Sequence, residues 1–188
     1  MSGEQTTSAV KHFSNQVGLT LRLLEESTQW ANRAELYIGL LKTAITKDLR
    51  TSNSPMVLWD YCSERRALIH NLTPRDLFQN SGKTPTEATF GTQGDLSNLC
   101  TFGWYDWCYY RETSNHQFPH QRWLLGRVLG PSKNEGNEMA QNVLTHLGTV
   151  VPRRTVVPLT TIQWTNPVEV RRRHDFDHII KRKADIQR

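Results

Sequence analysis

The sequence predicts an α/β fold of the α+β kind, with a helical first half followed by a small β-barrel and a basic tail. Three observations support this prediction. Apolar residues recur at helical spacing between positions 30 and 72, and aromatic and β-favouring residues become dense from Leu99 onward. The net charge of +5 arises after position 150, where nine Lys and Arg residues stand against four acids.

The first elements along the chain are predicted as a leader, a short strand and a strong helix. In the leader, residues 1–17, positions 11–17 favour a helix that Gly18 ends. Residues 19–25, LTLRLLE, predict a short and mostly buried strand. Residues 30–49 predict the first strong helix. Its expected apolar stripe consists of Leu36, Tyr37, Leu40, Leu41, Ala44 and Ile45.

A second helix is predicted to follow at once. Ser54 is expected to be its N-cap and Pro55 its first helical residue. Its buried side is expected to comprise Val57, Leu58, Tyr61, Cys62, Leu68, Ile69 and Leu72. Residues 79–85 favour a loop, and residues 86–89 favour a short helical turn.

The second half of the chain favours strands. In residues 100–110, CTFGWYDWCYY, aromatic side chains at strand spacing favour packing in a core over stacking on bases. Residues 123–129, 141–144 and 148–159 predict further strands, and short strands between turns suggest a small β-barrel. The expected domains are therefore a leader (1–17), an α/β part (18–98), a barrel (99–160) and a mobile basic tail (161–188) with one helical candidate at 168–183.

Composition limits the class of protein. With 188 residues, one domain with room for a second small one is expected. No apolar run approaches the ~20 residues that span a bilayer, and positions 1–13 lack the apolar core of a signal peptide. Three widely spaced cysteines fit neither a disulfide framework nor a zinc site. We therefore expect no membrane association and an intracellular protein of the nucleus or cytoplasm.

The basic C-terminal block suggests a polyanionic partner. Lysine and arginine clusters bind phosphates because they release condensed counterions. The candidate phosphate-contacting residues are Arg153, Arg154, Arg171, Arg172 and Arg173. On composition alone a solvated tail without a partner is an equal alternative, and so is an exposed barrel rim for Arg153 and Arg154.

Glu35 is the candidate catalytic residue. It lies beside the apolar stripe of the first strong helix, and Lys42 follows on the same face. A helix-borne Glu can supply one ligand of a two-metal phosphoryl-transfer site, with Lys42 near a phosphate and Asn32 positioning a base or the backbone. From spacing alone, a solvated helix acid that pairs with its neighbours is the more common case.

Four ordered segments resemble the integrase of copia-type long-terminal-repeat retrotransposons. Residues 32–35, NRAE, resemble the helix that bears the third acid of the Asp-Asp-Glu triad. Residues 54–72 resemble the helix that follows it, and residues 83–91, KTPTEATFG, resemble a further element of the family. The most specific match is residues 94–104, GDLSNLCTFGW.

The resemblance extends from about Gly18 to Thr160 and implies a fragment of a Gag-Pol-like polyprotein. It implies a truncated ribonuclease-H-like core (one strand plus helices) at 18–98, then the small barrel and a basic linker. By this resemblance Glu35 corresponds to the third catalytic acid and to a ligand of Mg²⁺ or Mn²⁺. Lys42 corresponds to a DNA-contacting lysine.

The sequence departs from the family upstream of Glu35. The family has two Asp residues there, whereas no Asp precedes Asp48 in this chain. One carboxylate does not hold two divalent ions against their hydration. We therefore expect no cofactor for this chain alone and no independent catalysis, unless another chain supplies the two aspartates.

The expected function is that of an integrase fragment that binds DNA through non-specific backbone contacts. The expected partners are DNA and either a second copy of the chain or another chain encoded by the same element. Two alternatives remain open. One is a non-catalytic protein-interaction or assembly module, and the other is an unstable fragment arising from gene prediction, whose first helix would expose an apolar face.

Overall fold

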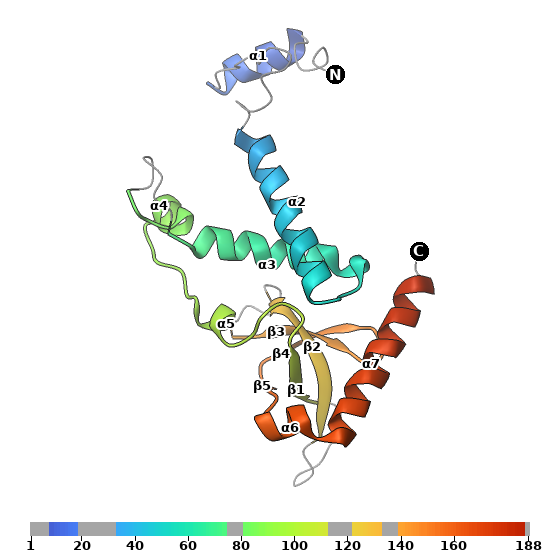
Figure 1. Cartoon of the computed structure of the whole chain (residues 1–188). Coiled ribbons are helices and arrows are strands. Elements are labelled where there is room, and N and C mark those ends of the chain that lie inside the picture. Colours follow the sequence, from blue (N-terminus) through green and yellow to red (C-terminus); the bar gives the residue numbers. More distant parts are fainter. Residues whose placement is uncertain (1–7, 19–32, 75–80, 113–121, 133–138, 187–188) are drawn as a thin grey trace. The chain divides into compact units, whose positions relative to one another are not determined.

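The computed structural model describes residues 8–18, 33–74, 81–112, 122–132 and 139–186. In these ranges the chain forms seven α-helices and one open antiparallel sheet of five strands, which confirms a mixed α+β fold (Figure 1). The chain divides into two compact units, residues 1–42 and 43–188, and each is described by itself. None of the helices in the described ranges is both long and apolar enough to cross a membrane.

The first unit contains α1 (Ser8–Gln16) and the first half of α2 (Arg33–Thr51). Helix α1 confirms the helix expected before Gly18, and Gly18 has a φ of 71°, a conformation in which glycine costs little. The strand expected at 19–25 lies outside the described residues.

The apolar stripe expected along α2 is buried only in the second half of the helix. Leu36 is 53 % exposed and Leu40 is 54 % exposed, whereas Ile45 and Leu49 are buried. The helix itself is confirmed, because its apolar spacing has the right period. Leu36 and Leu40 are nevertheless exposed, because burial depends on what packs against a helix rather than on its spacing.

The second unit begins with the last turns of α2 and continues into a 3₁₀ turn, η3 (Met56–Leu58), and α3 (Trp59–Leu72). The expected N-cap is wrong, because Pro55 precedes the 3₁₀ turn and no side chain caps α3. The Ser54 hydroxyl instead accepts hydrogen bonds from Ser52 and from the Trp104 indole N–H, at 2.9 and 3.1 Å. It therefore joins the helices to the loop that precedes the sheet.

Two short helices lead from α3 to the sheet. In α4 (Pro85–Phe90), the Thr84 hydroxyl caps the helix by accepting from the Glu87 amide at 3.0 Å. Gly91 ends α4 in the left-handed conformation, with φ of 72°. This extends the helical turn expected at 86–89. Helix α5 (Ser97–Cys100) was not expected.

The five strands are β1 (Trp107–Arg111), β2 (Trp123–Pro131), β3 (Gln141–Thr145), β4 (Val150–Arg153) and β5 (Val156–Pro158). Their order across the sheet is β4-β3-β2-β1-β5, with every pair antiparallel. The strands predicted from residues 123–129, 141–144 and 148–159 are confirmed. Pro152 and Pro158 lie in the two edge strands, where a missing N–H costs least.

Both faces of the sheet are packed. Successive side chains along a strand point to opposite faces and so belong to two different clusters. One cluster contains Phe102, Cys108, Tyr110, Val128 and Val143. The other contains Leu58, Tyr105, Trp107, Leu129, Leu144, Leu159, Phe176 and Ile180. This alternation follows from the two-residue period of a strand, and it explains why the strands are apolar on nearly every residue.

The sheet is open, so the expected closed barrel is wrong. Its edge strands β4 and β5 pair with β3 and β1 and not with each other. They are nevertheless consecutive in the chain, separated only by Arg154 and Thr155. One segment therefore passes from one edge of the sheet to the other and bends the sheet without closing it.

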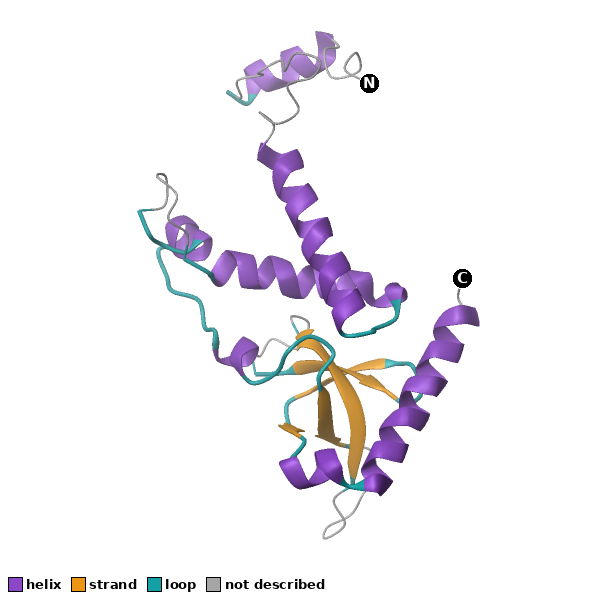
Figure 2. Ribbon diagram, viewed as in Figure 1, coloured by secondary structure: helices purple, strands orange, loops and turns teal. Residues whose placement is uncertain are grey.

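The C-terminal segment forms two helices, α6 (Thr161–Thr165) and α7 (Pro167–Ile186), and α7 runs alongside the sheet (Figure 2). Thr160 and Gln163 form a capping box at the start of α6. Helix α7 confirms the candidate helix at 168–183. The mobile tail expected here is wrong for 161–186, because Phe176 and Ile180 are buried in the core cluster.

Candidate nucleic-acid interface

The residues expected to form the catalytic site do not form one in the described structure. Glu35 lies in the first turn of α2, is exposed, and shares a helix face with Lys42. Asn32 lies outside the described residues. Within the described ranges, no three His, Cys, Asp or Glu side chains lie close enough together to hold a metal ion. The structure therefore offers Glu35 as a single carboxylate on a helix surface.

A basic cluster forms where β1 ends, β2 begins and the chain turns from β4 to β5. We call it the strand-end cluster, and its members are Arg111, Glu112, Arg122, Arg153 and Arg154. The backbone holds these strand ends together. The Arg111 amide donates to the Thr155 carbonyl at 3.1 Å, and the Glu112 amide donates to the Arg122 carbonyl at 3.0 Å.

Three members of the strand-end cluster, Glu112, Arg122 and Arg153, act on Tyr110, which belongs to the cluster of Phe102, Cys108, Val128 and Val143. The Arg153 guanidinium lies 5.9 Å from the centre of the Tyr110 ring. Burial raises the pKa of Tyr110, and the carboxylate of Glu112 raises it further, while Arg153 and Arg122 oppose that shift. These effects show that the charges of Glu112, Arg122 and Arg153 all act on one buried phenol.

The strand-end cluster contains four arginines and one acid. Glu112 is the one acid in the cluster, and its Oε2 lies 3.7 Å from Nη1 of Arg122, whose side chain is 60 % exposed. Arg111 and Arg154 are exposed as well. Arg153 is half-buried and uses Nη1 to donate to the Pro152 carbonyl at 2.8 Å. The guanidinium groups of Arg111, Arg122 and Arg154 are thus exposed, and that of Arg122 lies near a carboxylate.

Guanidinium groups in this arrangement suit phosphate oxygens. Arginine presents a planar set of donors that matches a phosphate and loses little hydration on binding. Trp123 adds an aromatic surface, since it pairs with Arg111 across β1 and β2 and is 40 % exposed. Cross-strand partners share a sheet face, so the Trp123 ring and the Arg111 guanidinium are presented together.

The three consecutive arginines of α7 have three different environments. Arg171 is exposed, and Arg172 donates to Glu169 at 3.0 Å. Arg173 is only 8 % exposed, lies over the Trp164 ring at 4.5 Å, and donates to the Trp164 carbonyl at 2.7 Å. Arg173 therefore caps the end of α6. Of the three residues expected to contact nucleic acid, it is the one whose guanidinium is buried.

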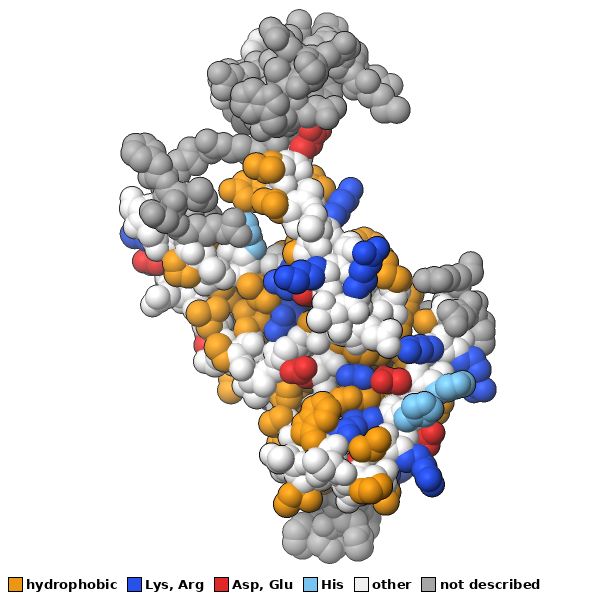
Figure 3. All heavy atoms as spheres, viewed as in Figure 1, with side chains coloured by type: hydrophobic (Ala, Val, Ile, Leu, Met, Phe, Trp, Pro, Cys, Tyr) orange, Lys and Arg blue, Asp and Glu red, His pale blue; other side chains and the backbone are white. Residues whose placement is uncertain are grey.

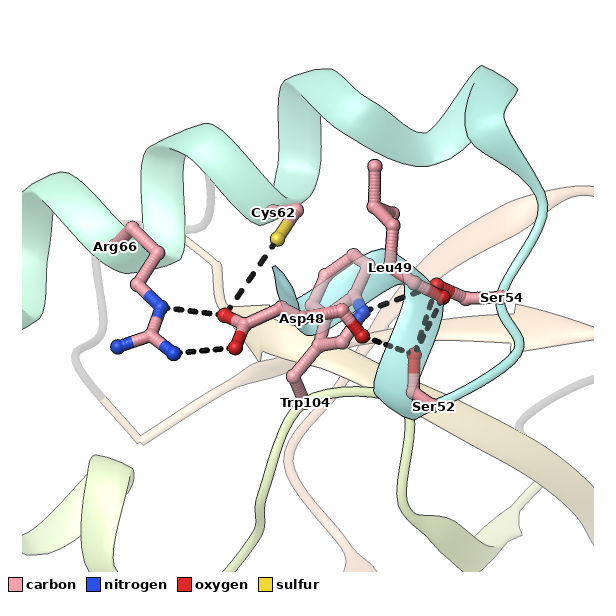
Figure 4. Close-up of polar contacts among 7 residues, drawn as sticks. All are labelled: Asp48, Leu49, Ser52, Ser54, Cys62, Arg66 and Trp104. Atoms are coloured by element: carbon pink, nitrogen blue, oxygen red, sulfur yellow. Dashed lines mark hydrogen bonds and ion pairs between the residues drawn. The ribbon is translucent and has the colours of Figure 1, made fainter. Parts of the chain in front are cut away.

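A second charged group, the Asp48 cluster, ties the end of α2 to α3 (Figure 4). It consists of Asp48, Cys62 and Arg66. Nε and Nη2 of Arg66 both donate to the carboxylate of Asp48, and the Cys62 thiol lies 3.8 Å from the same carboxylate. Burial and the adjacent carboxylate raise the pKa of Cys62 to about 11. The thiol therefore stays protonated at neutral pH and is no nucleophile.

A third charged group, the Arg127 cluster, fastens α7 to the sheet. Its guanidinium lies 3.4 Å from the centre of the Trp107 ring and 4.4 Å from that of Tyr105. It donates to both oxygens of Asp177, at 2.7 and 3.0 Å, and to the Tyr105 carbonyl at 2.8 Å. Burial lowers the pKa of Arg127, and the carboxylate of Asp177 opposes this. The Arg127 guanidinium thus serves to pack α7 against the sheet.

Sequence reasoning identified part of the candidate interface. Arg153 and Arg154 were expected contacts, but Arg111 and Arg122 were not. These two are far from the basic C-terminal block in sequence, and the sheet register alone brings them to the β4–β5 corner. Their positions could have indicated this. Arg111 ends the strand before the β1–β2 connection, and Arg122 directly precedes the strand after it.

Comparison of the sequence with models of known protein families, and with curated proteins, gives no match for this chain.

Proposed function

We propose that this chain is a nucleic-acid-binding protein related to copia-type integrases, which contacts DNA phosphates through the strand-end cluster and does not catalyse integration by itself. In this proposal α2 and α3 correspond to helices of a truncated ribonuclease-H-like core. The sheet corresponds to the small β-domain that follows that core. The four ordered sequence segments support the relationship.

One observation carries the binding part of the proposal. Arg111, Arg122 and Arg154 are exposed at one end of the sheet, in a cluster with one carboxylate. They come from three different segments of the chain, and backbone hydrogen bonds join these segments, from Arg111 to Thr155 and from Glu112 to Arg122. A set of cations on a rigid frame binds a phosphate backbone with little loss of conformational entropy.

In this proposal the 188 residues alone do not catalyse integration, because the described ranges contain no group of three His, Cys, Asp or Glu side chains that could hold a metal ion. A two-metal reaction on DNA needs several carboxylates to hold its ions. The two missing aspartates would have to come from another segment or another chain. A strand-transfer assay with Mg²⁺ or Mn²⁺, comparing the wild type with Glu35→Gln, tests this point. Activity in the wild type that survives the substitution would refute the role given to Glu35.

The binding proposal is tested by titrating a fluorescein-labelled duplex of random sequence with the protein. The test variant is Arg111→Gln/Arg122→Gln/Arg154→Gln. Its matched control is Lys47→Gln/Arg50→Gln/Lys83→Gln, which removes the same charge from exposed positions elsewhere in the second unit. At 0.15 M salt, each lost phosphate contact weakens binding about five-fold, so we expect the test variant to bind roughly 100-fold more weakly. Equal losses in the two variants would contradict the assigned surface.

A second candidate function, assembly with a protein partner, is favoured by the first half of α2. Leu36, Ile38 and Leu40 are each more than half exposed, which is unusual for three apolar residues within two turns. Light scattering with size-exclusion chromatography tests this candidate. A dimer that Leu36→Lys/Leu40→Lys dissociates would support assembly, and a monomer at all concentrations would argue against self-association.

A further inference from the structure

Helix α7 carries a stripe of basic and histidine side chains on its exposed face. The stripe consists of Arg171, His174, His178 and Lys181, all exposed. The spacing of three, four and three residues places them on one side of an α-helix over about 15 Å. Figure 3 shows Lys, Arg and His side chains gathered along this helix.

The opposite face of α7 makes the contacts with the rest of the fold. Phe176 and Ile180 lie in the core cluster, Asp177 pairs with Arg127, and Arg173 caps α6. The stripe is therefore held rigidly on a helix while its side chains face water. His174 is 78 % exposed.

The charges around the two histidines are predominantly positive. Arg171 and Lys181 flank them within the stripe, and Arg182 is exposed one residue beyond. Two acids of α7 are close in sequence to the histidines. Asp175 has Oδ1 3.9 Å from Nδ1 of His174 and a side chain that is 66 % exposed, and Asp177 is paired with Arg127. The rings of His174 and His178 are 6.3 Å apart, so both can face one extended ligand.

We propose that this stripe is a second phosphate-binding surface, which engages duplex nucleic acid more tightly as the pH falls and the two histidines become charged. Histidine is the side chain whose charge changes within the pH range that cells use for switching. Duplex DNA carries one charge for about every 1.7 Å of its axis, so a 15 Å stripe of cations runs past several phosphates. The inference rests on the proposed nucleic-acid function but uses different residues.

The occupant is taken to be a duplex rather than a membrane because of the shape and composition of this face. Its members are polar and charged, and an interfacial membrane helix needs a large apolar face beside its basic one. On α7 that apolar face, Phe176 with Ile180, is already buried in the core.

The experiment compares the affinity for the labelled duplex at pH 8.0 and pH 5.5 in 0.15 M salt. Wild type is expected to bind more tightly at pH 5.5, by roughly five-fold for each histidine that contacts a phosphate. His174→Gln/His178→Gln should lose this pH response. The matched control, His146→Gln, removes an exposed histidine from the β3–β4 turn and should keep it.

The outcomes separate this inference from the proposed function. A pH response that the double histidine variant retains would overturn the inference, while the loss of binding at pH 8.0 in the strand-end variant would still support the proposed function. Suppose instead that the double histidine variant loses the pH response while the strand-end variant binds normally. That result would support the inference and contradict the strand-end surface of the proposed function. Binding at pH 5.5 to vesicles containing phosphatidylserine, without binding to the duplex, would overturn the choice of nucleic acid as the ligand.

Discussion

Arginine serves opposite purposes in two regions of the second unit. In the Arg127 cluster the guanidinium is stacked between two aromatic rings and bonded to both oxygens of one carboxylate. In the strand-end cluster, three guanidinium groups are exposed, and that of Arg122 lies 3.7 Å from the one acid, Glu112. A count of charges treats both regions alike, but only the second has cations available to a ligand.

The difference follows from what each region must satisfy. A buried guanidinium without a partner costs several kcal/mol, so Arg127 is surrounded by acceptors and rings. An exposed guanidinium keeps its hydration and contributes little to stability. Arg127 should therefore be needed for folding, whereas Arg111 and Arg154 should not.

The largest effect on stability is expected from Arg127→Ala. It removes a guanidinium that is largely buried and leaves Asp177 without its partner. We expect the free energy of unfolding to fall by about 3 kcal/mol. Urea denaturation followed by tryptophan fluorescence measures this. A loss below about 0.5 kcal/mol, as for ordinary surface sites, would contradict the structural role of the cluster.

Asp48→Ala should have the next largest effect. The carboxylate accepts two hydrogen bonds from Arg66 and is itself largely buried. Its removal should lower the free energy of unfolding by about 2 kcal/mol, because Arg66 loses a charged partner. The control is Asp60→Ala on an exposed position of α3. Equal effects of the two substitutions would show that the Asp48 cluster does not tie the helices together.

The free energy of unfolding should fall at alkaline pH because of the buried thiol of Cys108. Burial raises the pKa of Cys108 from its ordinary 9.0 to about 12. Between these values the unfolded chain loses the proton that the folded chain retains, so stability falls by about 1.4 kcal/mol per pH unit above pH 9. Cys108→Ala should remove this contribution, and Cys100→Ala, at an exposed position, should not. Identical pH slopes in the two variants would refute the prediction.

The smallest effect on stability is expected from Arg111→Gln and Arg154→Gln. Both side chains are exposed, and neither substitution removes a buried contact. The free energy of unfolding should change by less than about 0.5 kcal/mol. A larger loss would show that these arginines serve the fold, as Arg127 does, and would remove the contrast between the two regions.

Local patterns in the sequence predicted the elements better than their packing. The spacing of apolar residues predicted α2 and α7, and the β-favouring runs predicted β2 and β3. The open sheet was not predicted, because closure depends on whether β4 and β5 pair with each other, which strand patterns do not determine. The same limit applies to Leu36 and Leu40, whose spacing is right but whose face is exposed.

The charged clusters show the limit most clearly. Arg127 and Asp177 are fifty positions apart, and no local pattern joins them. The burial of Arg173 had a visible signal, since it precedes Phe176 and Ile180 by three and seven residues on the same helix face. The prediction of a mobile tail did not take this spacing into account. Phe176 and Ile180 mark the packed side of α7, on which Arg173 lies and Arg171 does not.

The most direct test of the central claim is the salt dependence of duplex binding. The logarithm of the association constant is measured against the logarithm of salt concentration for wild type, Arg111→Gln/Arg122→Gln/Arg154→Gln and Lys47→Gln/Arg50→Gln/Lys83→Gln. Each phosphate contact contributes about 0.9 to the slope, so the strand-end variant should lose roughly 2.7 and the control should match wild type. The same slope in all three proteins, or no binding by the wild type at low salt, would contradict the account.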